Sequence, residues 1–167
     1  MKFYKLLTLA FLSALLLNAC VQKDNKVYES IDEMVPAAKA EIKTMGMEEL
    51  KSLIDQQAEI QVVDCREDYD FILGHITGSV HIPRGILEFS DKISNRRIKT
   101  LVIGNEQGSG ALAVKSLELL KYQDVYMLDF SWFDWEEQYP ELVEQGMGEK
   151  VATESVKKES SGGGCGD

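Results

Sequence analysis

The sequence predicts an α/β fold built on a parallel sheet, and two patterns support this. Short runs rich in β-branched and other apolar residues, each long enough for one strand, occur at 60–63, 79–82, 100–103 and 124–128. Segments with the composition or apolar spacing of helices lie beside them, at 47–57, 67–73, 111–121 and 132–138. Strands that alternate with helices form parallel sheets covered on both faces, with ligands at the carboxyl ends of the strands.

Two features of the predicted helices bear on how they pack. An additional helix is expected at 28–40, before the first strand, and Pro36 within it predicts a kink or a break. The helix at 132–138 carries Trp132 and Trp135 three residues apart, which places both on one face. We therefore expect these two tryptophans to anchor the helix to the core.

The N-terminus is typical of an exported protein. Two lysines precede an apolar stretch at 6–17, which is too short to span a bilayer, so residues 1–19 are predicted to be a signal peptide. The signal ends in Leu-Asn-Ala-Cys at 17–20, which resembles the lipobox of bacterial lipoproteins. That resemblance implies cleavage before Cys20 and acylation of its sulfur, with palmitate as the typical chain. An ordinary signal peptide followed by a chance cysteine is the alternative.

The expected location follows from that anchor. The protein would be attached to the cell envelope, on the periplasmic side or at the outer membrane if the cell is Gram-negative. Removal of residues 1–19 takes away two lysines and no acids, which changes the net charge from −10 to −12. An acidic chain of this kind disfavours nucleic acid as a partner and does not steer small anions towards it.

Two motifs in the middle of the chain resemble a known family. The segment 62–67 reads Val-Val-Asp-Cys-Arg-Glu, and the segment 74–83 reads Gly-His-Ile-Thr-Gly-Ser-Val-His-Ile-Pro. These motifs and their spacing resemble the first half of the rhodanese-like domain. The strand at 100–103, its loop and the Ala-rich helix after it resemble the second half. The resemblance covers about residues 42–145 and implies a central parallel sheet of about five strands, with helices on both faces.

The chain is accordingly divided into four parts. They are a signal peptide at 1–19, a lipidated tether and helical extension at 20–41, a rhodanese-like domain at 42–148 and a flexible tail at 149–167. We expect a monomer with no cofactor. Two histidines and scattered cysteines lack the spacing of a metal site, so no metal ligand is assigned.

The resemblance also suggests which polar residues support the site. In the family, the residues that match Asp64, Arg66 and Glu67 brace the site without doing chemistry. His75 allows two interpretations, a pH-sensitive catalytic group or a hydrogen-bonded structural histidine. The structural interpretation is favoured, because no acidic partner for His75 can be placed from the sequence.

In active rhodaneses, the loop after the strand that matches 100–103 begins with a nucleophilic cysteine. Backbone N–H groups of that loop stabilise its thiolate and the anionic sulfur substrate. Here Gly104 holds the cysteine position, Ser109 stands where arginine is frequent, and Glu106 adds a carboxylate. Glycine cannot form a persulfide, so we assign no catalytic residue. The predicted binding loop comprises Gly104, Asn105, Glu106, Gln107, Gly108, Ser109 and Gly110.

Two functions from different classes follow. The first is a pseudoenzyme that uses this loop to bind a protein or a small sulfur-containing ligand. The second is a thiosulfate or persulfide sulfurtransferase, or a sulfur carrier, with a displaced cysteine. Cys65 lies at the end of a strand, where a buried packing thiol is the alternative, and Cys165 lies in a glycine-rich tail. A phosphatase is the weakest alternative, because related phosphatases also need the loop cysteine.

Overall fold

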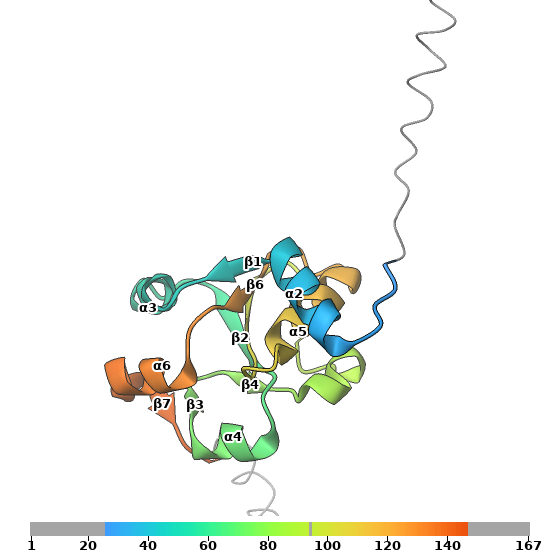
Figure 1. Ribbon diagram of the computed structural model, residues 1–167. Coiled ribbons are helices and arrows are strands. Elements are labelled where there is room, and N and C mark those ends of the chain that lie inside the picture. Colours follow the sequence, from blue (N-terminus) through green and yellow to red (C-terminus); the bar gives the residue numbers. More distant parts are fainter. Residues whose placement is uncertain (1–25, 94, 147–167) are drawn as a thin grey trace, which may run out of the picture.

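The computed structural model describes residues 26–93 and 95–146. Its centre is a five-stranded sheet in the order β1-β6-β5-β2-β4, and every neighbouring pair is parallel (Figure 1). The strands are β1 (Lys43–Met45), β2 (Ile60–Asp64), β4 (Val80–His81), β5 (Lys99–Ile103) and β6 (Val125–Leu128). The predicted α/β class with a central parallel sheet of five strands is therefore confirmed.

Helices cover both faces of this sheet, as the sequence predicts (Figure 1). The α-helices are α2 (Ile31–Glu41), α3 (Met47–Asp55), α4 (Asp68–Leu73), α5 (Ser109–Leu119) and α6 (Trp132–Gln138). The short 3₁₀ helices are η1 (Arg84–Phe89) and η2 (Pro140–Leu142). A separate antiparallel pair joins β3 (His75–Ile76) to β7 (Val143–Glu144).

The core is split in two because successive residues of a strand point to opposite faces of the sheet. Val102 of β5 packs on one face, in a cluster with buried residues of α2, α5 and η1. Its neighbours Leu101 and Ile103 pack on the other face, in a cluster with buried residues of α3 and α6. Parallel pairing places the carboxyl ends of β2, β5 and β6 side by side, and the ends of β2 and β5 carry motifs singled out in the sequence.

The structure differs from the predictions at several places, and the β3–β7 pair is one that was not predicted. Helix α2 runs without interruption through Pro36, so the predicted break is wrong, and its packing through buried Ala38 accounts for its persistence. Strand β1 was not predicted, because three residues carry too short a pattern to recognise. Helix α5 begins two residues early, since Gly108 adopts a φ of +97° and turns the loop into the helix.

Several predictions fall on residues outside the described part of the chain. These are the signal peptide, the lipid attachment at Cys20, and the tail with Cys165. Between residues 26 and 146, leaving aside residue 94, the helices are all too short or too polar to cross a bilayer.

Candidate functional site

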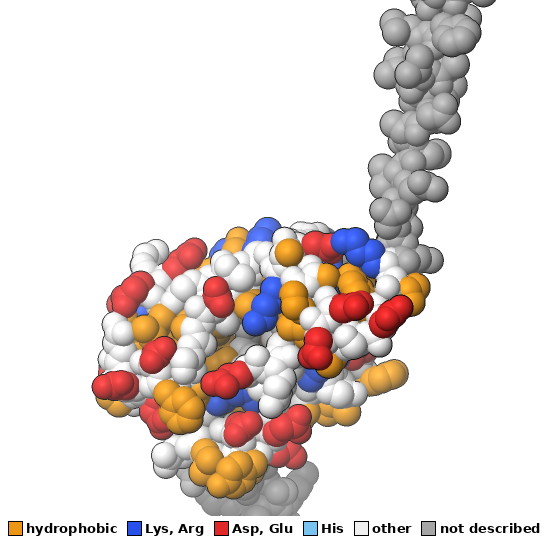
Figure 2. Space-filling model, in the orientation of Figure 1, with side chains coloured by type: hydrophobic (Ala, Val, Ile, Leu, Met, Phe, Trp, Pro, Cys, Tyr) orange, Lys and Arg blue, Asp and Glu red, His pale blue; other side chains and the backbone are white. Residues whose placement is uncertain are grey.

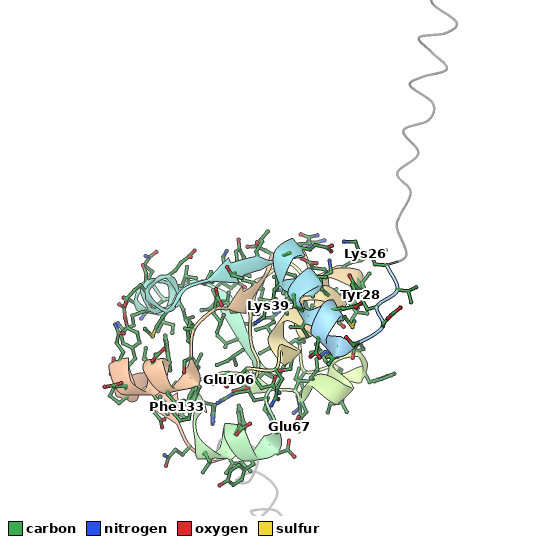
Figure 3. All side chains as sticks on the ribbon, in the orientation of Figure 1. Lys26, Tyr28, Lys39, Glu67, Glu106 and Phe133 are labelled. Atoms are coloured by element: carbon green, nitrogen blue, oxygen red, sulfur yellow. The ribbon has the colours of Figure 1, made fainter. Side chains whose placement is uncertain are left out.

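A cavity of about 540 Å³ lies at the carboxyl ends of β2, β5 and β6. Its lining comes from the loop after β5, from the continuous segment 127–133, and from Lys39, Arg66 and Asp70. Lys39 on α2, Glu106 on the loop and Phe133 on α6 lie around the same part of the molecule (Figure 3). The cavity is therefore located where a parallel sheet is expected to bind ligands, and its volume is within the range of small-molecule pockets.

The loop at 104–110 is closed by hydrogen bonds between its own residues. The Asn105 N–H donates to Ser109 Oγ at 2.8 Å, and the Ser109 N–H donates to Asn105 Oδ1 at 3.1 Å. The Gly108 N–H donates to the Asn105 carbonyl at 3.2 Å. Three backbone donors that could otherwise face an anion are thus used inside the loop. Ser109 stabilises the loop from within, and neither Ser109 nor Gln107 lines the cavity.

The closed loop leaves no room for a side chain at Gly104. A Cβ atom placed on Gly104 would lie 2.1 Å from the Gly110 nitrogen and 2.5 Å from its Cα. Both are backbone atoms, so they could retreat only if the whole loop moved. The space that a side chain at position 104 would need is therefore occupied by the far end of the same loop.

Helix α2 holds this loop from outside. A Cβ atom on Gly108 would lie 2.3 Å from Val35 Cγ1, so the α2 side chain packs directly against the glycine. One turn further along, Lys39 lines the cavity. Helix α2 thus contributes one wall of the site. This role could not be predicted from the sequence, because the contact joins segments more than 60 residues apart in the chain.

Asp64 and Arg66 form a buried ion pair at the base of the cavity. Arg66 Nη2 donates to Asp64 Oδ2 at 2.6 Å, and Nε lies 3.0 Å from Oδ1. Nη2 also donates to the Gly74 carbonyl at 2.7 Å, and the guanidinium lies over the Trp132 ring, 4.2 Å from its centroid. Asp64 is fully buried and Arg66 is 5% exposed. This geometry fits the bracing role that the resemblance implies for the pair.

The tryptophans play two different roles. Trp135 is fully buried and packs between Phe130 and Tyr139, as expected of a core anchor. Trp132 is only partly buried: it packs against the same core cluster and also forms a wall of the cavity, so its prediction as a core anchor describes only part of its role. A helix residue turns about 100° from its neighbour, so a spacing of three separates two side chains by about 60° and lets one reach the cavity.

The other predicted supporting residues lie apart from the cavity. Glu67 is exposed at the start of α4 and takes part in none of the ion pairs found among the described residues. His75 is buried, with Nδ1 2.9 Å from the Phe71 carbonyl and its ring stacked on Phe71. Its Nε2 lies 3.7 Å from Glu144 of β7, an acidic partner that the sequence did not reveal. These contacts agree with a structural histidine.

Cys65 packs on the α2 and α5 side of the sheet, among apolar side chains. It is 1% exposed and does not line the cavity. Burial raises the pKa of its thiol from the ordinary value of 9.0 to about 12, and the neighbouring Asp64 carboxylate acts in the same direction. About one thiol in ten thousand would be ionised at pH 8 with that pKa. Cys65 is thus a packing residue here.

Acidic side chains surround the outer part of the cavity. Asp70, Glu106 and Asp129 line it and are solvent-exposed, and Lys39 is the exposed cation among the lining residues. Acidic side chains are also frequent over the surrounding surface (Figure 2). Since Arg66 is neutralised by Asp64, the exposed groups give the cavity a net charge of −2. Of the five charged residues that line the cavity, only Arg66 and Glu106 were predicted from the sequence as part of the site.

A five-stranded parallel sheet with helices on both faces, and with a loop and helix directly after β5, is the architecture of a rhodanese-like domain, and comparison with known proteins agrees. The family model for the rhodanese-like domain matches residues 46–138, so the chain belongs to this family. The thiosulfate sulfurtransferase GlpE of Pseudomonas putida is 30% identical over 110 residues, which cover 66% of this chain and 99% of that protein.

Solved structures with the same fold include two sulfurtransferases. The human single-domain sulfurtransferase TSTD1 has 18% identity and a TM-score of 0.51, over 57% of this chain and 96% of that one. A thiosulfate sulfurtransferase from Pseudomonas aeruginosa has 20% identity and a TM-score of 0.56, over 63% of this chain and 20% of that one. At this identity, the two structures support the fold alone.

Proposed function

We propose that this protein is a rhodanese-like binding module that does not transfer sulfur. The observation that carries the proposal is the closed loop at 104–110, in which Gly110 backbone atoms fill the space that a side chain at Gly104 would need. Sulfur transfer requires a thiolate that attacks a sulfane sulfur and is stabilised as a persulfide. Glycine offers no thiol, and three amide donors of the loop are already bonded.

The charge of the cavity supports the same proposal. Thiosulfate and persulfides are anions, and the exposed groups around the cavity carry a net charge of −2. The one thiol among the described residues, Cys65, is buried in the core cluster with α2 and α5, does not line the cavity, and has a raised pKa. A ligand that binds in this cavity would therefore meet mainly aromatic, apolar and acidic groups, with no thiol among the described lining residues.

The second candidate function is sulfur transfer or sulfur carriage by a displaced cysteine. The similarity to the sulfurtransferase GlpE favours it. Cys65 is a poor candidate because of its burial, which leaves Cys165, outside the described residues. A thiol brought from the tail would have to reach the cavity and bind a sulfur donor there against the negative charge of Asp70, Glu106 and Asp129.

An activity assay separates the two functions. We expect the purified protein to show no thiosulfate:cyanide sulfurtransferase turnover above the rate without protein, with a related active sulfurtransferase as positive control. After exposure to polysulfide, mass spectrometry is expected to find no persulfide on Cys65. Turnover that is lost in Cys165→Ser or Cys65→Ser would establish the displaced-cysteine function instead.

We also propose that the domain is held at the cell envelope by a lipid on Cys20. The support is the apolar segment at 6–17 followed by the lipobox-like sequence at 17–20. Each acyl CH₂ buried in a bilayer contributes about 0.8 kcal/mol, so two or more chains give a stable anchor. Labelled palmitate is expected to enter the wild-type protein and not Cys20→Ser. Equal labelling of both would contradict the anchor, and Cys165→Ser serves as the matched control.

A further inference from the structure

The cavity contains one buried cation whose hydrogen-bonding capacity is only partly used. Arg66 directs Nε and Nη2 to Asp64 and to the Gly74 carbonyl. Its Nη1 makes no hydrogen bond to any residue that the structure describes, yet Arg66 lines the cavity while only 5% exposed. The two N–H groups of Nη1 are therefore available to an acceptor that enters the cavity.

The charged residues that line this cavity differ in how deeply they are buried. Arg66 lies at the buried end, whereas Asp70, Glu106 and Asp129 are exposed at the outer end. The Arg66 Nη1 donors favour a ligand that carries a hydrogen-bond acceptor. A carboxylate is a suitable acceptor, because its hydrogen bonds with a guanidinium are charge-assisted and strong. The exposed carboxylates Asp70, Glu106 and Asp129 favour a ligand whose other end is cationic. An anion alone would be repelled at the mouth, and a cation alone would leave the Nη1 donors without an acceptor.

The larger uncharged side chains of the lining are apolar or aromatic. Met127, Leu128, Phe130 and Trp132 contribute to the lining, and Phe133 stands at 72% exposure beside them. These side chains suit a hydrophobic body that lies between an inner acceptor and an outer cation. An aromatic body gains additional favourable contacts with rings of this kind.

We infer that this cavity binds a small zwitterion with an apolar or aromatic body, such as a hydrophobic α-amino acid. Its carboxylate would accept hydrogen bonds from Arg66 Nη1, and its ammonium would lie among Asp70, Glu106 and Asp129. The inference rests on the proposed function, because it takes the cavity as a binding site without chemistry.

Calorimetry with three compounds that share one body tests the inference on the purified full chain. The compounds are L-phenylalanine, 3-phenylpropanoate, which lacks the ammonium, and 2-phenylethylamine, which lacks the carboxylate. We expect the amino acid to bind at least tenfold more tightly than either of the others, since each lost group removes a charge-assisted interaction. Equal binding of the acid or of the amine would overturn the inference, as would no binding of the amino acid at several millimolar.

Variants at the mouth provide a second readout without touching the buried pair. Combined replacement Glu106→Gln and Asp129→Asn is expected to weaken binding of L-phenylalanine and 2-phenylethylamine several-fold and to leave 3-phenylpropanoate unchanged or tighter. Asp134→Asn, an exposed carboxylate of α6 that does not line the cavity, is the matched control. Equal effects of the two changes would overturn the inference. Because binding is measured directly, its absence is distinguishable from sulfurtransferase turnover, which would contradict the proposed function alone.

Discussion

Replacement of Asp64 with alanine is expected to lower the free energy of unfolding by about 3–5 kcal/mol. The carboxylate is fully buried and accepts hydrogen bonds from the Arg66 side chain and from the Arg66 backbone N–H. Without it, a guanidinium that is 5% exposed would keep its charge with no counter-ion. Equilibrium unfolding in urea, monitored by tryptophan fluorescence and by circular dichroism, measures the loss.

An exposed ion pair offers the matched control for this change. Asp55 pairs with Lys51 at 2.6 Å, one helical turn away, and the Asp55 side chain is 60% exposed. Asp55→Ala should cost about 0.5 kcal/mol or less, because water screens an exposed pair. If Asp64→Ala cost no more than Asp55→Ala, the Asp64–Arg66 pair would not be the support of this site.

A cysteine at position 104 is expected to destabilise the protein and to restore no activity. The Cβ of Gly104→Cys would lie 2.1 Å from the Gly110 nitrogen, so the loop would have to open. Forcing a side chain into a filled space typically costs about 1–3 kcal/mol, and we expect the upper part of this range because the obstacle is backbone. Urea unfolding and a thiosulfate:cyanide assay check the two parts of the prediction.

Two glycine variants separate steric from chemical effects at that loop. Gly104→Ala should destabilise as much as Gly104→Cys, since both add the same Cβ atom. Gly85→Ala, at a position with no atom within 4 Å of the added Cβ, should change stability by less than about 0.5 kcal/mol. A stable Gly104→Cys protein with sulfurtransferase turnover would show that the loop opens readily and that only the thiol is missing.

Local pattern was enough to predict most of the framework. Runs of β-branched and other apolar residues predict buried strands such as β2 and β5. The Gly104–Gly110 loop directly follows β5. The motif at 62–67 placed Asp64 and Arg66 at the end of a strand, so their proximity to the loop followed from parallel pairing.

The rest of the site depends on contacts between distant segments. Lys39 enters the cavity only because α2 packs against the loop through Val35, and neither residue belongs to a recognisable motif. The acidic partner of His75 comes from β7, which is two residues long. Closure of the loop depends on the side-chain rotamers of Asn105 and Ser109, which form the hydrogen bonds across it. Spacing along the chain does not encode any of these.

The position of β1 has a consequence for where this domain begins as a folding unit. The family model starts at residue 46, whereas β1 ends at Met45 and pairs along one edge with β6. A fragment trimmed to the matched residues would leave the outer edge of β6 with unpaired N–H and C=O groups, open to strands of other molecules. With β1 in place, the open edge at this side of the sheet is a strand of three residues, and very short edge strands pair less readily with other molecules.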